Sequence, residues 1–301
     1  MSHGLRFRAL TFDEGYGRDT AFLDGLEERG QVFVGEVPTN FHGWVIKPKM
    51  LREGPSPRRG RKKKYPRLAR GKPSSEVQNL LRYSPAFRNK AWQRYCIKDT
   101  ERGPVVWETK WAVFWRKGVD GLPGRRHCLI VARNVVTNEV KYFVSNRVPG
   151  ERGITVRLLL RVAFGRWSVE NCFRQAKEEL GLDHYEVRSW RCVHRHFYLT
   201  QLSHLFCARM RQKFDDATTR DAPLKRLTTE QVRRAMNAWL VAAAGRLTKN
   251  ERLEQELAKQ LYYQGRNAQA KRSHTKTQRA RLKDLGINVD RIKSCDPKTT
   301  T

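Results

Sequence analysis

In the first 38 residues the spacing of hydrophobic positions changes from that of a strand to that of a helix and back again. Residues 4–13 read as a short strand that ends at Asp13 and is followed by a glycine-containing turn. Residues 19–30 place apolar side chains on one helical face and end in a glycine, which predicts a helix. Residues 31–38 predict a second strand. The order strand, helix, strand is typical of an α/β layer.

The middle of the chain predicts a small antiparallel sheet behind a polar loop. Residues 107–115, 126–134 and 139–146 alternate or run apolar, and turns separate them. The preceding residues 48–75 combine repeated Pro and Gly with many basic residues, so we expect a loop there.

Helical periodicity follows from about residue 155. Residues 155–167 lead into residues 168–181, where apolar side chains recur on one side of the predicted helix. Gly181 suits the left-handed position that ends a helix. Residues 194–212 predict a further helix.

Two capping boxes predict the last helices. Thr228 with Gln231 and Thr248 with Glu251 have the required spacing, so a helix is expected to begin at each pair. From about residue 268 the chain is basic and poor in core residues, and its last residues are expected to be disordered.

The composition points to a polyanionic partner. Lys and Arg number 61 against 30 Asp and Glu, which gives a formal net charge of +31. Nucleic acid is the leading candidate for such an excess, and an anionic membrane surface is the weaker one. The sequence has no apolar run of the ~20 residues that a spanning helix needs, and no signal peptide. The six cysteines form no CxxC pair, so we expect free thiols and a cytoplasmic protein.

One acidic residue lies between basic residues on the predicted helix 168–181. Arg166, Glu170 and Lys177 fall near one side of it, together with Arg174. The plainer interpretation is a solvated ladder of ion pairs. The functional interpretation has Glu170 binding a divalent cation while Arg166 and Lys177 contact DNA phosphates. Spacing alone favours the ladder.

Asp13 is a second candidate carboxylate. An Asp between a strand and a glycine turn is often only a turn former or helix cap. The carboxyl end of a strand in an α/β sheet is also a place where metal and substrate sites are built. Asp13 and Glu170 are therefore two distant acids that could share one divalent ion.

These two stretches resemble the DDE transposases of bacterial insertion sequences. Asp13 with Tyr16 matches the family motif D-x-x-Y-G, and Arg166, Glu170 and Lys177 match the signature Y-x-x-R-x-x-x-E-x-x-x-x-x-x-K. The chain departs from that signature at Ala163, where relatives have Tyr, and this puts one accessory DNA contact in doubt.

The resemblance implies an α/β fold with a partial RNase H-like core, a β-rich insertion and a helical C-terminal region. It places the first catalytic Asp on a strand upstream of this chain, so the chain is expected to be N-terminally truncated and inactive alone. The implied segments are four. Residues 1–47 form the second half of the sheet, and residues 48–146 form the basic loop with the insertion. Residues 147–225 form the catalytic-Glu helix with its packing helices, and residues 226–301 form a basic helical region with a disordered tail.

The resemblance also implies residue roles. Asp13 and Glu170 would be catalytic and would bind Mg²⁺ or Mn²⁺. Arg166, Lys177 and Tyr16 would position phosphates. The partners would be DNA, as transposon ends and target, and a second copy of the chain or a full-length transposase. The protein would act in the cytoplasm at the nucleoid.

Further DNA contacts are expected at two basic stretches. The first is the loop between Pro55 and Ser75, where a solvated tail is the alternative; its candidates are Arg58, Arg59, Arg61, Lys62, Lys63 and Lys64. The second interleaves aromatic and basic residues after the Glu170 helix, and its candidates are Arg188, Trp190 and Arg195. The alternative there is that Trp190 and Tyr185 belong to the core. We reject zinc binding by the Cys and His residues of 192–207, because their spacing does not supply four ligands.

Two function classes remain open. The first is a DNA transposase that cleaves and joins strands at insertion-sequence ends, of which this chain is a C-terminal portion. The second is a non-catalytic DNA-binding product that modulates a full-length transposase. A general nucleoid protein would explain the charge but not the paired motifs.

Overall fold

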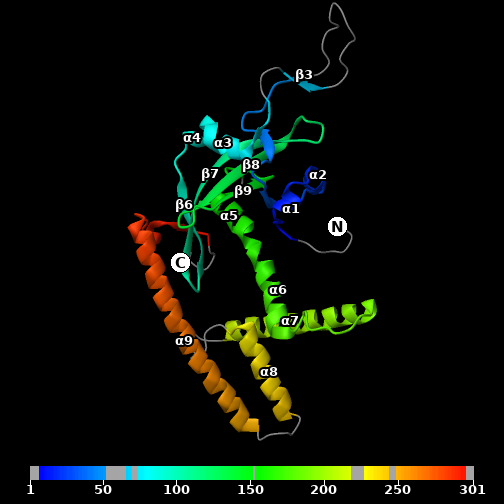
Figure 1. Cartoon of the computed structure of the whole chain (residues 1–301), viewed down its shortest axis with the longest axis vertical. Helices are drawn as coiled ribbons and strands as arrows, with labels where there is room; N and C mark the ends of the chain where they lie inside the picture. The colour runs from blue at the N-terminus through cyan, green and yellow to red at the C-terminus, as the bar shows by residue number, and fades with distance from the viewer. Residues whose placement is uncertain are drawn as a thin grey trace, which may run out of the picture. The chain divides into compact units, whose positions relative to one another are not determined.

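The computed structural model describes residues 7–51, 66–69, 73–151, 153–217, 227–243 and 249–295. The chain forms two compact units (Figure 1). Unit one comprises Met1–Arg166 and Thr277–Thr301, and unit two comprises Trp167–Lys276. The fold class is mixed α/β, as predicted, with a mixed sheet in unit one and helices in unit two.

The predicted helix and second strand at the start of unit one are confirmed, while the described part of the first predicted strand forms one isolated bridge. Leu10 and Phe33 form a parallel bridge. The Leu10 amide donates to the Val32 carbonyl at 2.8 Å, and the Val34 amide donates to the Leu10 carbonyl at 2.9 Å. The elements of this opening are α1 Glu14–Gly17, α2 Thr20–Glu28 and β1 Val34–Val37.

The three stretches predicted as an antiparallel sheet form β7 Gly103–Lys117, β8 Pro123–Asn134 and β9 Val140–Ser145. Along the sheet the order is β1-β9-β8-β7-β2-β5, and β6 pairs with β7 and with β10. The remaining strands are β2 His42–Trp44, β3 Met50–Leu51, β4 Arg67–Leu68, β5 Ser75–Glu76, β6 Gln93–Thr100 and β10 Lys293–Ser294. Strands β3 and β4 form a separate pair.

One sheet joins the opening of the chain to its middle. β1 pairs with β9, and β2 pairs with β7, both antiparallel. The segments 1–47 and 48–146, which the resemblance implies as separate parts, therefore share a continuous backbone ladder. The division into four segments stays a prediction.

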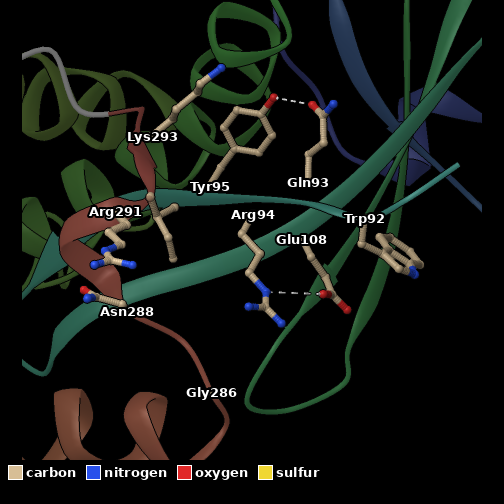
Figure 2. Close-up of a pocket in the computed structure, with 10 residues that line it drawn as sticks. Trp92, Gln93, Arg94, Tyr95, Glu108, Gly286, Asn288, Arg291 and Lys293 are labelled. Atoms are coloured by element: carbon tan, nitrogen blue, oxygen red, sulfur yellow. Dashed lines mark hydrogen bonds and ion pairs between the residues drawn. The ribbon is translucent and has the colours of Figure 1, made fainter.

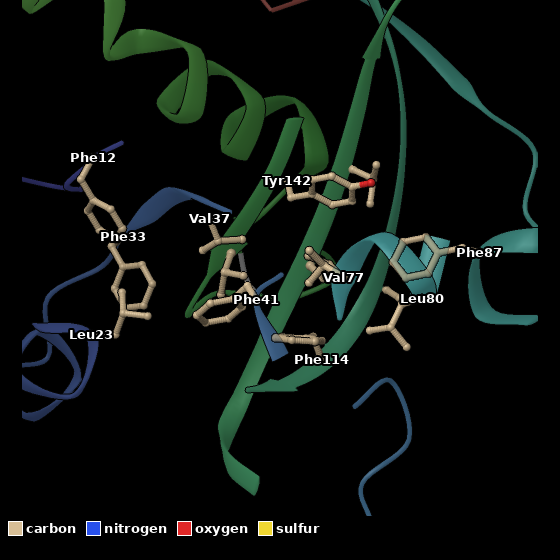
Figure 3. Packing of buried hydrophobic residues seen from close by; sticks show 14 residues of the cluster. Phe12, Leu23, Phe33, Val37, Phe41, Val77, Leu80, Phe87, Phe114 and Tyr142 are labelled. Atoms are coloured by element: carbon tan, nitrogen blue, oxygen red, sulfur yellow. The ribbon is translucent and has the colours of Figure 1, made fainter. Parts of the chain in front are cut away.

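Both faces of this sheet are buried. Leu129 and Val131 of β8 pack into one cluster, which includes residues of α2, α3 Val77–Tyr83 and α4 Pro85–Arg88 (Figure 3). Ile130 of β8 packs into the other cluster, with residues of α5 Val156–Gly165. A strand that is covered on both faces reads as a continuous apolar run, which explains the pattern of residues 126–134.

The end of the chain adds core residues to unit one. The last turn of α9 Lys249–Asp284 buries Leu282, and Ile287 follows it in the same cluster. The η1 turn Val289–Arg291 leads to β10, which pairs in parallel with β6. The sequence pattern, basic and poor in apolar residues, did not reveal this packing.

Unit two is helical, with α6 Trp167–Leu180, α7 Trp190–Ala217 and α8 Thr229–Ala243. Gly181 ends α6 at φ +69°, and its amide donates to the Lys177 carbonyl at 3.2 Å, as in the αL capping motif. The predicted helix end is thus confirmed.

The first predicted capping box is also confirmed. The Thr228 amide donates to Gln231 Oε1 at 2.8 Å, and the Gln231 amide donates to Thr228 Oγ1 at 3.1 Å. The second predicted box rests on Thr248, which lies outside the described residues.

A buried ion network attaches α2 to the sheet. Glu27 Oε1 lies 2.6 Å from His127 Nε2 and 3.4 Å from Arg116 Nε. Arg116 is 1% exposed and also pairs with Asp24. His127 Nδ1 lies 2.8 Å from the Arg125 carbonyl, so both ring nitrogens have an oxygen neighbour. The network links residues about 90 to 100 positions apart.

Candidate active site

Asp13 lies directly after the bridged strand segment and caps α1. Its Oδ1 accepts hydrogen bonds from the Gly15 amide at 3.1 Å and the Tyr16 amide at 3.3 Å. Within the described part of the chain, Oδ2 makes no hydrogen bond and the side chain is half-buried. The capping interpretation is therefore correct, and the second carboxylate oxygen stays open to a cation.

Close backbone approach fixes the turn after Asp13. A Cβ atom on Gly17 would lie 1.8 Å from the Glu36 carbonyl oxygen, so α1 packs against β1 only because residue 17 has no side chain. Tyr16 beside it is 61% exposed, and its ring centroid lies 5.4 Å from that of Phe22. The glycine of the sequence motif thus has a packing reason, while Tyr16 remains accessible.

Gly17→Ala is expected to destabilise unit one by about 1–3 kcal/mol, because the added methyl group meets backbone rather than a movable side chain. Chemical denaturation followed by fluorescence would measure the loss. Gly165→Ala is the matched control, since nothing lies within 4 Å of the Cβ position there. Equal stability of the two variants would contradict the packing argument.

Glu170 and Lys177 both lie on α6, two turns apart, and both are exposed. Arg174 between them pairs with Glu178 and donates to Asn171 Oδ1 at 2.8 Å. Arg174 therefore has partners other than the Glu170 of the supposed ladder. The spacing of Glu170 and Lys177 still places both on one side of the helix.

Arg166 occupies the junction between the units. It is the C-cap of α5 and the last residue of unit one before α6 begins at Trp167. Asp13 belongs to unit one and Glu170 to unit two. Their convergence on one metal ion stays a prediction, as do the roles of Arg166 and Lys177.

The residue types fit a hard divalent cation. Asp13 has an open carboxylate oxygen and Glu170 is an exposed carboxylate, and oxygen ligands of this kind suit Mg²⁺ and Mn²⁺. Across the ranges described above, no group of three or more His, Cys, Asp or Glu side chains is placed to bind a metal ion.

The predicted DNA-binding residues divide into two groups. The basic loop with Arg58, Arg59, Arg61, Lys62, Lys63 and Lys64 lies outside the described residues. The second group is described: Arg188, Trp190 and Arg195 are all exposed. Trp190 is 75% exposed and its ring centroid lies 4.1 Å from that of His194, whereas Tyr185 is 48% exposed. The core alternative for these aromatic residues is wrong, and the DNA-contact interpretation stays open.

No helix in the described ranges combines the length and the apolar character that a membrane crossing requires.

Comparison with curated proteins finds no match to the chain. Comparison with protein families finds a match over residues 1–104. This stretch includes Asp13, Tyr16 and Gly17 but not Glu170. Over these residues the chain is similar to the family described as DDE superfamily endonuclease, a similarity that indicates a nuclease or transposase role with DNA as substrate.

Proposed function

We propose that this chain forms part of a DNA transposase, in which Asp13 and Glu170 are metal-binding carboxylates for strand cleavage and transfer at insertion-sequence ends. The observation that carries the proposal is the position of Asp13. It lies three residues after the parallel bridge between Leu10 and Phe33, within the stretch similar to DDE endonucleases, and one of its oxygens is open.

Each candidate residue has a distinct role in this proposal. Asp13 and Glu170 hold the cation, and Mg²⁺ or Mn²⁺, when bound, would polarise the scissile phosphodiester and lower the pKa of an attacking water. Arg166 and Lys177 would hold DNA phosphates beside the acids as charge-assisted hydrogen-bond donors. Tyr16, which is exposed next to Asp13, would contact the same strand.

A third carboxylate has to complete such a site. The described residues contain no cluster of three candidate ligands, and the family pattern has a further Asp before Asp13. We propose that a separate upstream segment or a full-length transposase contributes it. On this proposal the chain alone is inactive.

The test is DNA cleavage after reconstitution with a separate segment or a full-length transposase that supplies the further Asp. Cleavage of labelled duplexes with element ends should require Mg²⁺ or Mn²⁺ and should stop when EDTA is added. Metal-dependent cleavage by the reconstituted protein would support the proposal. Cleavage that persists without a divalent ion would contradict it.

The alternative is a non-catalytic DNA-binding product that modulates a full-length transposase. The net charge of +31 and the exposed Trp190 with its basic neighbours favour it. It predicts retention of DNA in gel shifts without any metal requirement, and no cleavage under any reconstitution. Glu170→Ala would then leave DNA binding unchanged.

A further inference from the structure

Unit one has an open groove of about 840 Å³ that shares no residue with the candidate active site (Figure 2). Its walls come from β6, from β7 and from the residues that follow α9. The lining residues on which the argument rests are Trp92, Arg94, Glu108, Arg291 and Lys293. The two walls are nearly 200 positions apart in sequence and meet because β10 pairs with β6.

The carboxylate in the groove is already neutralised. Glu108 Oε1 accepts a hydrogen bond from Arg133 Nε at 2.7 Å, and Glu108 Oε2 lies 4.0 Å from Arg94 Nε (Figure 2). Two guanidinium groups therefore share one carboxylate, and a positive charge is left over on this wall.

The opposite wall adds charge without a counter-ion. Arg291 and Lys293 are exposed, and neither forms an ion pair with any residue that the structure describes. Asp290 beside them is bound by Arg279 Nη1 at 3.1 and 3.2 Å. The residues that line the groove therefore carry more positive than negative charge, so the groove attracts an anionic ligand.

Trp92 stands within this cationic surface. The Lys110 Nζ atom lies 4.9 Å from the ring centroid and the Arg133 guanidinium carbon lies 4.6 Å from it. Burial lowers the pKa of Lys110, and the charge of Arg133 lowers it further, while Glu108 acts in the opposite direction. Repulsion between Lys110 and Arg133 is thus the second cause of the lowered pKa, after burial.

The groove is held on ordered backbone. The Cys295 amide donates to the Cys96 carbonyl at 2.8 Å, and Gln278 Nε2 donates to the Pro104 carbonyl at 3.4 Å. Ile287, between them in sequence, is 4% exposed. Arg291 and Lys293 are therefore presented at fixed positions, which lowers the entropy lost when they bind a ligand.

We propose that this groove binds the phosphodiester backbone of DNA, with Arg291 and Lys293 as phosphate contacts and Arg94 supporting them. The choice of DNA rests on the proposed function; the anionic chemistry of the ligand rests on the groove alone. An open, cationic groove suits contacts that position the duplex and do not depend on sequence. The groove would then hold flanking DNA while the carboxylates act elsewhere.

The test measures binding of a random-sequence duplex by fluorescence anisotropy, without divalent metal, over a series of salt concentrations. Arg291→Ala/Lys293→Ala should weaken binding about tenfold or more near 0.1 M salt and should reduce the salt slope by roughly 1–2. The control is Lys117→Ala/Arg147→Ala, which removes two exposed cations of unit one outside the groove. It loses the same formal charge and should change binding much less.

Equal weakening by the two double variants would overturn the proposal, because net charge alone would then explain binding. So would a groove variant that binds DNA as the wild type does. These outcomes are separable from those of the cleavage assay. Metal-dependent cleavage together with unaffected DNA binding by the groove variant would contradict the groove proposal and support the transposase proposal. Weakened DNA binding by the groove variant together with metal-independent cleavage would support the groove proposal alone.

Discussion

Replacing Asp13 by Asn is expected to lower metal-dependent cleavage by the reconstituted protein about a thousandfold, which corresponds to ~4 kcal/mol of transition-state stabilisation. The amide has the shape of the carboxylate but lacks the charge that holds a divalent cation. Glu170→Gln should give a loss of similar size for the same reason. The double variant should be hardly worse than either single one, because both acids serve one metal site.

The choice of Asn separates chemistry from folding. Asp13 Oδ1 caps α1 through the amides of Gly15 and Tyr16, and Asn is an equally good N-cap. Asp13→Asn should therefore keep the fold, whereas Asp13→Ala would also lose about 1 kcal/mol of stability. A folded Asp13→Asn protein without cleavage identifies a chemical role.

Matched acidic residues serve as controls for position. Glu14 is adjacent to Asp13 and exposed, and Glu178 lies on α6 in an exposed pair with Arg174. Glu14→Gln and Glu178→Gln should cleave at nearly the wild-type rate. An Asp13→Asn variant that retains full cleavage would remove Asp13 from the proposed site, whatever the controls show.

Local sequence patterns predicted the elements around the site. The helix after Asp13 and the glycine end of α6 depend on contacts within a few residues, and the structure contains them, whereas the strand predicted before Asp13 is reduced to one bridge among the described residues. Gly17 is the limit of such reasoning. The sequence shows that Gly17 belongs to a motif, but it does not show why a glycine is required there. The requirement comes from the carbonyl oxygen of Glu36 in β1, 19 positions further along the chain.

Long-range pairing left no local signal. The groove joins β6 to residues beyond 286, and hydrophobic periodicity does not show that a basic tail pairs with a strand nearly 200 positions earlier. The possible convergence of Asp13 and Glu170 is a long-range question of the same kind. The family resemblance, and not periodicity, predicted it.

The buried network of α2 was missed for the same reason and has the second largest expected effect. Glu27, Arg116 and His127 are 7%, 1% and 0% exposed, so their charges are compensated mainly by one another. Arg125 Nε adds a contact to Glu27 Oε2 at 3.6 Å, and Asp24 pairs with Arg116. Glu27 is thus the carboxylate on which three cations converge.

Glu27→Gln is expected to destabilise unit one by about 3–5 kcal/mol, because it removes the buried carboxylate charge that Arg116 and His127 share. The side chain keeps its shape, so cavity formation contributes little. Urea denaturation would measure the loss, and amide hydrogen exchange of β7 and β8 would localise it to the sheet. Glu28→Gln, at the exposed neighbouring position, should change stability by less than about 0.5 kcal/mol.

The pH dependence of this loss follows from the pKa of Glu27. Burial alone would raise that pKa, but the hydrogen bond and charge of His127, together with the charge of Arg116, outweigh it, so the pKa is lowered from its ordinary value of 4.5. The folded protein then binds the Glu27 proton more weakly than the unfolded chain does. The stabilisation is complete above about pH 4.5 and is lost as the pH falls through the lower pKa of the folded state. The stability difference between wild type and Glu27→Gln should therefore be constant near neutral pH and smaller at a pH well below 4.5. A difference that stays the same at both pH values would show that the charge of Glu27 does not hold α2 to the sheet.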